Sequence, residues 1–176
     1  MSGDTIWFRL STTQDASNIV ALVNAAYRGD SSRVGWTTEA DLLDGQRADE
    51  EMIQALIRPP HSQLLLMLEG SSLLGSVHLE SNHGDGYLGM FTIAPERQAS
   101  GLGRLFLAAS EDYLRRELHC TTLKITVITL RAELIAWYER RGFVSTDEIL
   151  NFPGADPRYG IPKRDDLALR VYRKAL

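Results

Sequence analysis

The segment at residues 91–104, Phe-Thr-Ile-Ala-Pro-Glu-Arg-Gln-Ala-Ser-Gly-Leu-Gly-Arg, constrains the fold of this chain most. An apolar run ends at Pro95, and a stretch containing Gly101 and Gly103 then opens a long pattern of helix-forming residues. The first turn of a helix leaves main-chain N–H groups without partners and carries the positive end of the helix dipole. The segment therefore predicts a strand, a turn and a helix N-terminus that together bind an anion such as a phosphate.

The residues of the turn favour close contact between a ligand and the main chain. Gly101 and Gly103 have no Cβ, Ser100 offers a hydroxyl donor and Arg104 offers a positive charge. Two common phosphate motifs fit less well. A dinucleotide-binding Gly-x-Gly-x-x-Gly would have Phe106 at its last position, and a P-loop requires Gly-Lys-Ser/Thr after its second glycine.

The order strand, proline and Gln98-x-x-Gly101-x-Gly103 instead resembles the coenzyme A pyrophosphate loop of the GNAT acetyltransferase superfamily. Residues 133–143, Glu-Leu-Ile-Ala-Trp-Tyr-Glu-Arg-Arg-Gly-Phe, resemble a later helix of that family and its Tyr-Glu-x-x-Gly-Phe ending. Detailed matches are confined to residues 87–143. The resemblance implies an acetyl-CoA-dependent N-acetyltransferase that requires no metal.

The same resemblance places the cofactor. It implies that main-chain amides of the loop bind the pyrophosphate and that the pantetheine arm pairs with the preceding strand, where the two central strands of this family separate. Gly89 is compatible with a bulge there, or with close packing. The expected cofactor-binding residues are Phe91, Thr92, Ile93, Gln98, Ala99, Ser100, Gly101, Leu102, Gly103 and Arg104.

For catalysis, the resemblance implies direct attack of an amine on the thioester, with main-chain N–H near Ile93 facing the developing oxyanion. Tyr138 matches the family position whose phenol donates to the leaving sulfur, and its alternative role is packing beside Trp137. An amine with a pKa of about 10.4 must also lose a proton. The strand at 87–93 has no carboxylate, so His78 and Glu80 are the candidate relay, or else solvated cross-strand residues.

The acceptor is expected to be a small-molecule amine or amino-acid-like compound. Trp36, Glu39 and Arg47 lie in a loop-like stretch and could line its site, with Glu39 attracting an amine and Arg47 a carboxylate. Helix capping and surface solvation explain them equally well. The alternatives are a protein or peptide acceptor, and a non-catalytic acetyl-CoA sensor. Arg131 replaces an asparagine frequent in the family, so it is either a surface residue or a cofactor phosphate contact.

Composition narrows the partners. A net charge of -4 gives no general attraction to nucleic acid, and the cations at 115–116 and 140–141 are interleaved with acidic residues, as on solvated helix faces. No apolar run approaches the length of a membrane helix, so we expect a cytoplasmic protein without membrane or nucleic-acid partners. The single cysteine, Cys120, is expected to be a buried structural thiol. A homodimer is an expectation from the resemblance alone.

The hydrophobic pattern predicts one domain over residues 1–176 with the order β-α-α-β-β-β-α-β-α-β-β. Strands are expected at 6–10, 62–69, 73–80, 87–93, 123–128, from 143 and at 167–172; helices are expected after 15, up to 58, at 101–118 and at 131–140. Residues 27–46 and 151–166 are expected to form loops, the second ordered and functional. As the resemblance implies, the fold class is α/β (α+β), a mixed, mostly antiparallel sheet with helices on both faces.

Overall fold

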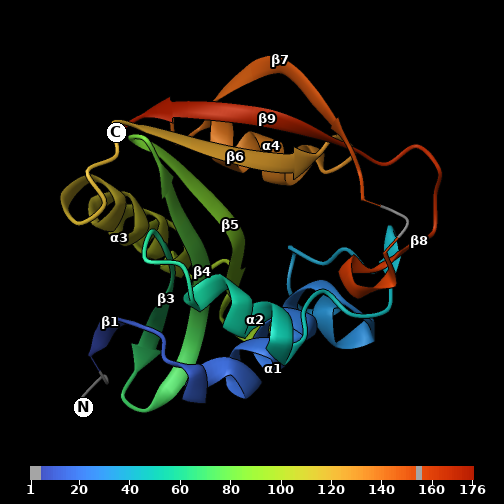
Figure 1. The fold of residues 1–176 in the computed structure, drawn as a ribbon. Helices are drawn as coiled ribbons and strands as arrows, with labels where there is room; N and C mark the ends of the chain where they lie inside the picture. The colour runs from blue at the N-terminus through green and yellow to red at the C-terminus, as the bar shows by residue number, and fades with distance from the viewer. Residues whose placement is uncertain (1–4, 154–155) are drawn as a thin grey trace.

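Two layers of helices enclose a sheet in the computed structural model, which describes residues 5–153 and 156–176 (Figure 1). The helices are α1 (Ala16–Tyr27), α2 (Glu50–Ile57), α3 (Leu102–Arg116) and α4 (Ala132–Glu139). The strands are β1 (Ile6–Leu10), β2 (Leu43–Asp44), β3 (Ser62–Glu69), β4 (Ser72–Asn82), β5 (Asp85–Ile93), β6 (Thr122–Ile128), β7 (Val144–Asn151), β8 (Ile161–Pro162) and β9 (Ala168–Ala175). Short 3₁₀ turns occur at Thr13–Asp15, Asp30–Val34, Pro95–Arg97 and Pro157–Tyr159.

Seven strands form the main sheet in the order β1-β3-β4-β5-β6-β9-β7. All neighbouring pairs are antiparallel except β5 and β6, which run parallel and pair only between residues 85–87 and 122–124. Beyond that point the two strands diverge, and Figure 1 shows the sheet opening between its β5 half and its β6 half. The edge of β5 from residue 88 to residue 93 therefore has no partner strand among the described residues.

The two faces of β3 explain the layering. Residues 64–68 of this strand are apolar and buried, as expected for a strand covered on both faces. Leu64, Leu66 and Leu68 pack with α1 and α2, whereas Leu65 and Met67 belong to the larger core that contains Phe106 of α3 and Tyr138 of α4. The expected fold, a mostly antiparallel mixed sheet with helices on both faces, is confirmed.

The short strands β2 and β8 were not expected. They pair antiparallel, Leu43 with Pro162 and Asp44 with Ile161, and so join the two segments that the sequence indicated as loops. Strands of two residues carry no readable alternation, and their pairing links parts of the chain more than a hundred residues apart. Residues 154–155 of the second loop lie outside the described residues.

Two smaller expectations, on Cys120 and on membrane helices, can be compared directly with the structure. Cys120 is 2 % exposed and free, which confirms a buried thiol. Within residues 5–153 and 156–176, none of the helices combines the length and the hydropathy that crossing a bilayer requires.

Candidate active site

The turn between β5 and α3 adopts the strained geometry typical of ligand loops. Ala99 (φ 59°) and Gly101 (φ 85°) are both left-handed, and Gly101 caps the N-terminus of α3. A Cβ built on Gly101 would meet nothing within 4 Å, so its face is open to a ligand. A Cβ on Gly103 would lie 3.3 Å from the Trp137 ring. The first glycine thus serves the backbone conformation, and the second allows α4 to approach.

A cavity of about 660 Å³ opens beside this turn, between the ends of β5, α3 and α4. Its charged lining is mainly basic and consists of Arg104, Arg131, Arg140, Arg141 and Glu133. Such a lining, next to the N-terminus of α3, favours a ligand with several negative charges.

Arg141 is held against the Trp137 ring. Its guanidinium lies 3.7 Å from the centre of the Trp137 ring and donates to the Trp137 carbonyl at 2.8 Å. Burial, with the neighbouring charges of Arg140 and Arg104, lowers its pKa. The expectation of a solvated face at 140–141 holds for Arg140, which is exposed, and is wrong for Arg141, which is half-buried against Trp137; both border the cavity. At 115–116 it is confirmed: both arginines are exposed and pair with Asp112.

Gln98 borders the same cavity, but its side chain is engaged elsewhere. Its Oε1 accepts from the N–H of Trp36 at 2.9 Å and of Thr37 at 3.2 Å. Its Nε2 donates to the Thr37 hydroxyl at 2.8 Å and to the Ile93 carbonyl at 3.0 Å. Gln98 therefore ties the loop after α1 to the end of β5 through its side-chain amide.

The other predicted cofactor residues divide into two groups. Phe91, Ile93, Ala99, Gly101, Gly103 and Arg104 border the cavity. The side chains of Thr92, Ser100 and Leu102 do not: the Thr92 hydroxyl donates to the Met90 carbonyl at 2.9 Å, and the Ser100 hydroxyl donates to the Arg97 carbonyl at 2.5 Å. Leu102 packs against the larger hydrophobic core, which contains Phe106.

A β-bulge distorts β5 where the sheet opens. The register of β4 with β5 shifts opposite Met90, whose φ is 46°, and the Tyr27 hydroxyl donates to the Phe91 carbonyl. Gly89 lies just before the bulge and serves close packing, since a Cβ there would be 2.7 Å from the Tyr87 ring. The bulge thus redirects the main chain at the edge that lacks a partner strand.

A second cavity of about 210 Å³ adjoins the first and shares Tyr27, Phe91, Arg131 and Leu134 with it. Tyr138 borders this second cavity, is 5 % exposed and stands edge-on to Trp137. Burial raises its pKa, so the phenol is protonated at neutral pH. Among the described residues, none is hydrogen-bonded to the Tyr138 hydroxyl. Tyr138 therefore packs in the core and also presents a proton donor to the cavity.

A buried ion-pair cluster forms one end of the second cavity. Glu39 accepts from Arg28 Nη1 at 2.5 Å through one oxygen and from Arg131 Nη1 at 3.0 Å through the other. Arg131 also donates to the Thr37 carbonyl at 2.6 Å, and its side chain is only 9 % exposed, so it is not a surface residue. The two arginines balance the negative charge of Glu39, which weakens the expected attraction of an amine to this carboxylate.

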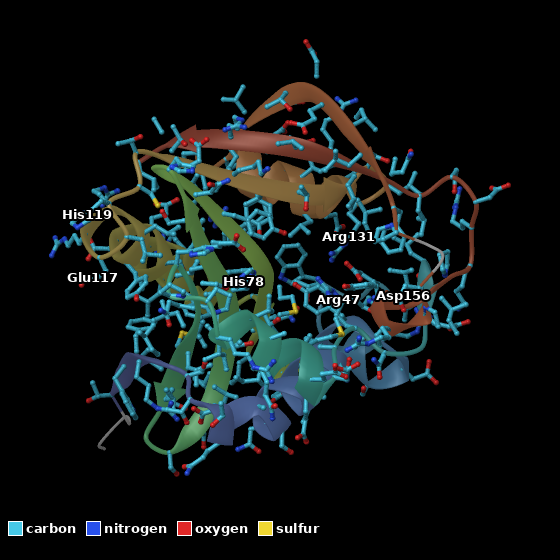
Figure 2. All side chains as sticks on the ribbon, in the orientation of Figure 1. Arg47, His78, Glu117, His119, Arg131 and Asp156 are labelled. Carbon is cyan, nitrogen blue, oxygen red and sulfur yellow. The ribbon has the colours of Figure 1, made fainter. Side chains whose placement is uncertain are left out.

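The remaining predicted residues fall in different places. Arg47 borders the second cavity, whereas Trp36 borders the first and packs against Trp137 at 6.5 Å between ring centres. His78 and Glu80 border neither of the two. In Figure 2, Arg47 and Arg131 lie in the opening of the sheet, and His78 lies away from them on β4.

His78 is enclosed behind β5, opposite Gly89 in the register. It is 6 % exposed, its Nε2 lies 2.8 Å from the Ser62 hydroxyl and 3.7 Å from Glu80, and burial lowers its pKa. The imidazole is therefore neutral at pH 7 and has no direct contact with either cavity.

The two expected loops both contribute to the wall of the second cavity, through Glu39 and Tyr159, and are bonded to each other. Besides the pairing of β2 with β8, Arg158 forms an ion pair with Asp49 at 3.2 Å, and Arg28 Nη2 donates to the Tyr159 carbonyl at 3.1 Å. Sequence reasoning did not assign Tyr27, Arg28 or Tyr87 to the site. Strand alternation could have found Tyr87, which shares a face with Gly89, but no sequence signal links Tyr27 or Arg28 to the cavity.

Comparisons with known proteins agree with this geometry. The sequence matches the Acetyltransferase (GNAT) family over residues 21–143, and no curated protein matches the chain by sequence. The ribosomal-protein-S18-alanine N-acetyltransferase from Escherichia coli has a similar structure, with TM-score 0.69 and 16% identity over 97% of this chain and 94% of that chain.

Two further solved structures share the fold. A point mutant of the spermidine N-acetyltransferase SpeG from Vibrio cholerae gives TM-score 0.68 and 18% identity, over 97% of this chain and 93% of that chain. The acetyltransferase yncA from Salmonella typhimurium, with its cofactor acetyl-CoA, gives TM-score 0.67 and 19% identity, over 97% and 94%. These identities show a shared fold, and the family match covers most of the sequence. The chain therefore belongs to the GNAT acetyltransferase family.

Proposed function

We propose that this protein transfers the acetyl group of acetyl-CoA to the amine of a small molecule held in the second cavity. One observation carries the proposal. A large basic cavity at the N-terminus of α3 meets a small cavity along the unpaired edge of β5. A cofactor with a phosphate-rich end and a reactive end would span the two, and an acceptor would meet it at the boundary.

The residues of the first cavity fit acetyl-CoA. The open face of Gly101 and the N–H groups at the start of α3 suit a pyrophosphate, and Arg104, Arg140 and Arg141 supply positive charge around it. Residues 88–93 offer main-chain groups on an edge without a partner strand, to which the amides of the pantetheine arm can bind as an added strand would.

Acetyl-CoA supplies a thioester, whose carbonyl carbon forms a bond to the amine nitrogen while its bond to sulfur breaks. The nitrogen loses one proton in this exchange and the sulfur gains one. In this proposal the protonated phenol of Tyr138 donates to the sulfur, and main-chain N–H groups of β5 beyond the bulge at Met90 bind the developing oxyanion. Both groups stabilise charge that appears only during transfer.

The proton of the amine needs a route outward. Tyr87 borders the second cavity and also a third, polar cavity of about 190 Å³, which Glu80 borders as well. In this proposal Glu80 receives the proton through water beside Tyr87. His78, whose Nε2 lies 3.7 Å from Glu80 Oε2, is the next group of this proposed relay after Glu80.

The size of the second cavity favours a small acceptor over a peptide. An extended peptide needs an open groove, whereas this cavity measures about 210 Å³ and is bordered by both loops, which β2 and β8 join. The similar folds include enzymes for a ribosomal-protein alanine and for spermidine, so the fold is compatible with both classes. A sensor domain would bind acetyl-CoA without releasing its thiol.

The deciding experiment measures thiol release from acetyl-CoA with amines, amino acids and short peptides, while calorimetry measures acetyl-CoA affinity. Tyr138→Phe is expected to lower kcat about 100-fold, because a general acid contributes that much or more, and to leave the affinity nearly unchanged. Tyr113→Phe, on α3 and outside both cavities, is the matched control. Equal losses of kcat and affinity in a folded Tyr138→Phe protein would contradict the role of the phenol.

A further inference from the structure

The second cavity, here called the acceptor cavity, carries an unbalanced charge. Its lining contains three arginines, Arg28, Arg47 and Arg131, and one acidic residue, Glu39, a formal excess of two positive charges in a space of about 210 Å³. A cationic acceptor such as a polyamine would enter against this field, whereas an anionic group would be attracted by it.

Arg28 and Arg131 are already engaged. They share Glu39, and each also donates to a main-chain carbonyl, of Tyr159 and Thr37 respectively. Arg47 differs from them. Its main-chain N–H is bonded to Asn24, but its guanidinium makes no ion pair or hydrogen bond to the residues that the structure describes. The side chain is half-buried at the cavity wall, and none of its nitrogens is both buried and unpartnered, so the guanidinium is accessible to a ligand.

Arg47 also lies near the proposed site of transfer. Its guanidinium carbon is 6.0 Å from the centre of the Tyr27 ring, and the Tyr27 hydroxyl donates to the Phe91 carbonyl on the unpaired edge of β5. One aromatic ring therefore separates the free guanidinium from the strand that would hold the thioester. A molecule a few bonds long can reach both positions.

We propose that the acceptor is a small amine that carries a carboxylate, and that Arg47 binds this carboxylate through the two N–H groups of its planar fork. This inference rests on the proposed acetyl transfer and specifies its substrate class. The rest of the wall suits the carbon skeleton of such a molecule, because Val127, Ile128, Phe152 and Leu169 are apolar. A volume below the usual 300–1,000 Å³ of drug-sized pockets also favours a compound as small as an amino acid.

The test uses amino acids with the amine at the α, β, γ or ω position, each paired with its own amide, together with spermidine. The pair keeps the amine and the side chain and removes only the negative charge. We expect kcat/KM for thiol release to be about 10- to 100-fold higher for the acids than for their amides, the range of charge-assisted hydrogen bonds. Arg47→Met should raise KM for the acids by a similar factor and change KM for the amides much less.

Two further variants make the result specific. Arg47→Lys keeps the charge without the fork and should recover part of the loss. Arg33→Met is the control, since Arg33 lies on the same loop, pairs with Asp30 and Asp41, and borders neither cavity. It should behave as wild type towards acids and amides.

The inference and the proposed function fail in different ways. If amides or spermidine react as well as the acids, the carboxylate site is wrong and acetyl transfer stands. If acetyl-CoA binds but no amine releases its thiol, transfer is wrong. The carboxylate site is then tested by ligand binding, measured as the rise in Tm of the acetyl-CoA complex. If the acids raise Tm no more than their amides do, the carboxylate site is wrong. If the acids raise Tm further and Arg47→Met abolishes this rise, the site is supported.

Discussion

Glutamine at position 39 removes one negative charge from the centre of the Arg28–Glu39–Arg131 cluster and changes little else. The three side chains are 4 %, 9 % and 9 % exposed, so water reaches them poorly. Glu39 is the acidic partner of both arginines in the described structure, and each of its oxygens accepts from one of them. Glu39→Gln keeps the size of the side chain and one acceptor oxygen, but leaves two buried guanidinium groups without a counter-charge.

The expected cost follows from this geometry. Removing one partner of a buried ion pair costs about 3–5 kcal/mol, because the remaining charge is desolvated without compensation. The carbonyls of Thr37 and Tyr159 still accept from the arginines, which places the loss at about 3 kcal/mol. For a chain of this size such a loss lowers Tm by about 6–12 °C.

Urea unfolding at pH 7, followed by tryptophan fluorescence and by circular dichroism, measures this loss. The control is Glu117→Gln, an exposed residue at the end of α3 that Figure 2 shows far from the opening of the sheet; its effect should stay within about 0.5 kcal/mol. In the Glu39→Gln background, Arg131→Met should cost less than in wild type, because the two residues are coupled. A loss below about 1 kcal/mol for Glu39→Gln would refute the argument, since it would mean that water already solvates the cluster.

Two other predictions concern the loop and the N-terminal region. Gly101→Glu should abolish acetyl-CoA binding in calorimetry, because it places a carboxylate where the pyrophosphate is proposed to lie; Gly101→Asn, which tolerates φ 85° and is neutral, should retain most of the affinity, and equal affinities for all three proteins would contradict the loop assignment. Hydrogen bonds from Arg9 lower the pKa of Asp15 from 3.8 to about 2, so its contribution to stability is complete above its unfolded pKa and is lost as the pH falls through the folded value. The difference in free energy of unfolding between wild type and Asp15→Asn should therefore be constant above about pH 5 and shrink from about pH 4 downwards, and a difference independent of pH would exclude this ion pair as its source.

The parts of the site that could be predicted from sequence are those that depend on neighbours along the chain. Gly101 and Gly103 predict the loop because a turn followed by a helix depends only on the local sequence. The resemblance indicates Tyr138 because its motif is contiguous in the chain. Gln98 was expected to face the cofactor, yet its amide bonds Trp36 and Thr37, which come from a loop some sixty residues earlier. That contact depends on where α1 places its following loop, and no local pattern encodes it.

The sequence by itself determined the order of the main strands and helices, the layers that their apolar faces form, and the position of the loop that is proposed to bind an anion. Periodicity and turn chemistry act over a few residues, so these features are readable without a structure. Only the tertiary structure decided that β9 lies between β6 and β7, that β2 pairs with β8, and that Arg47 borders the second cavity without a hydrogen-bond or ion-pair partner among the described residues. Each of these features depends on the packing of segments distant in the chain, and the charge of a cavity is set by which side chains that packing brings together.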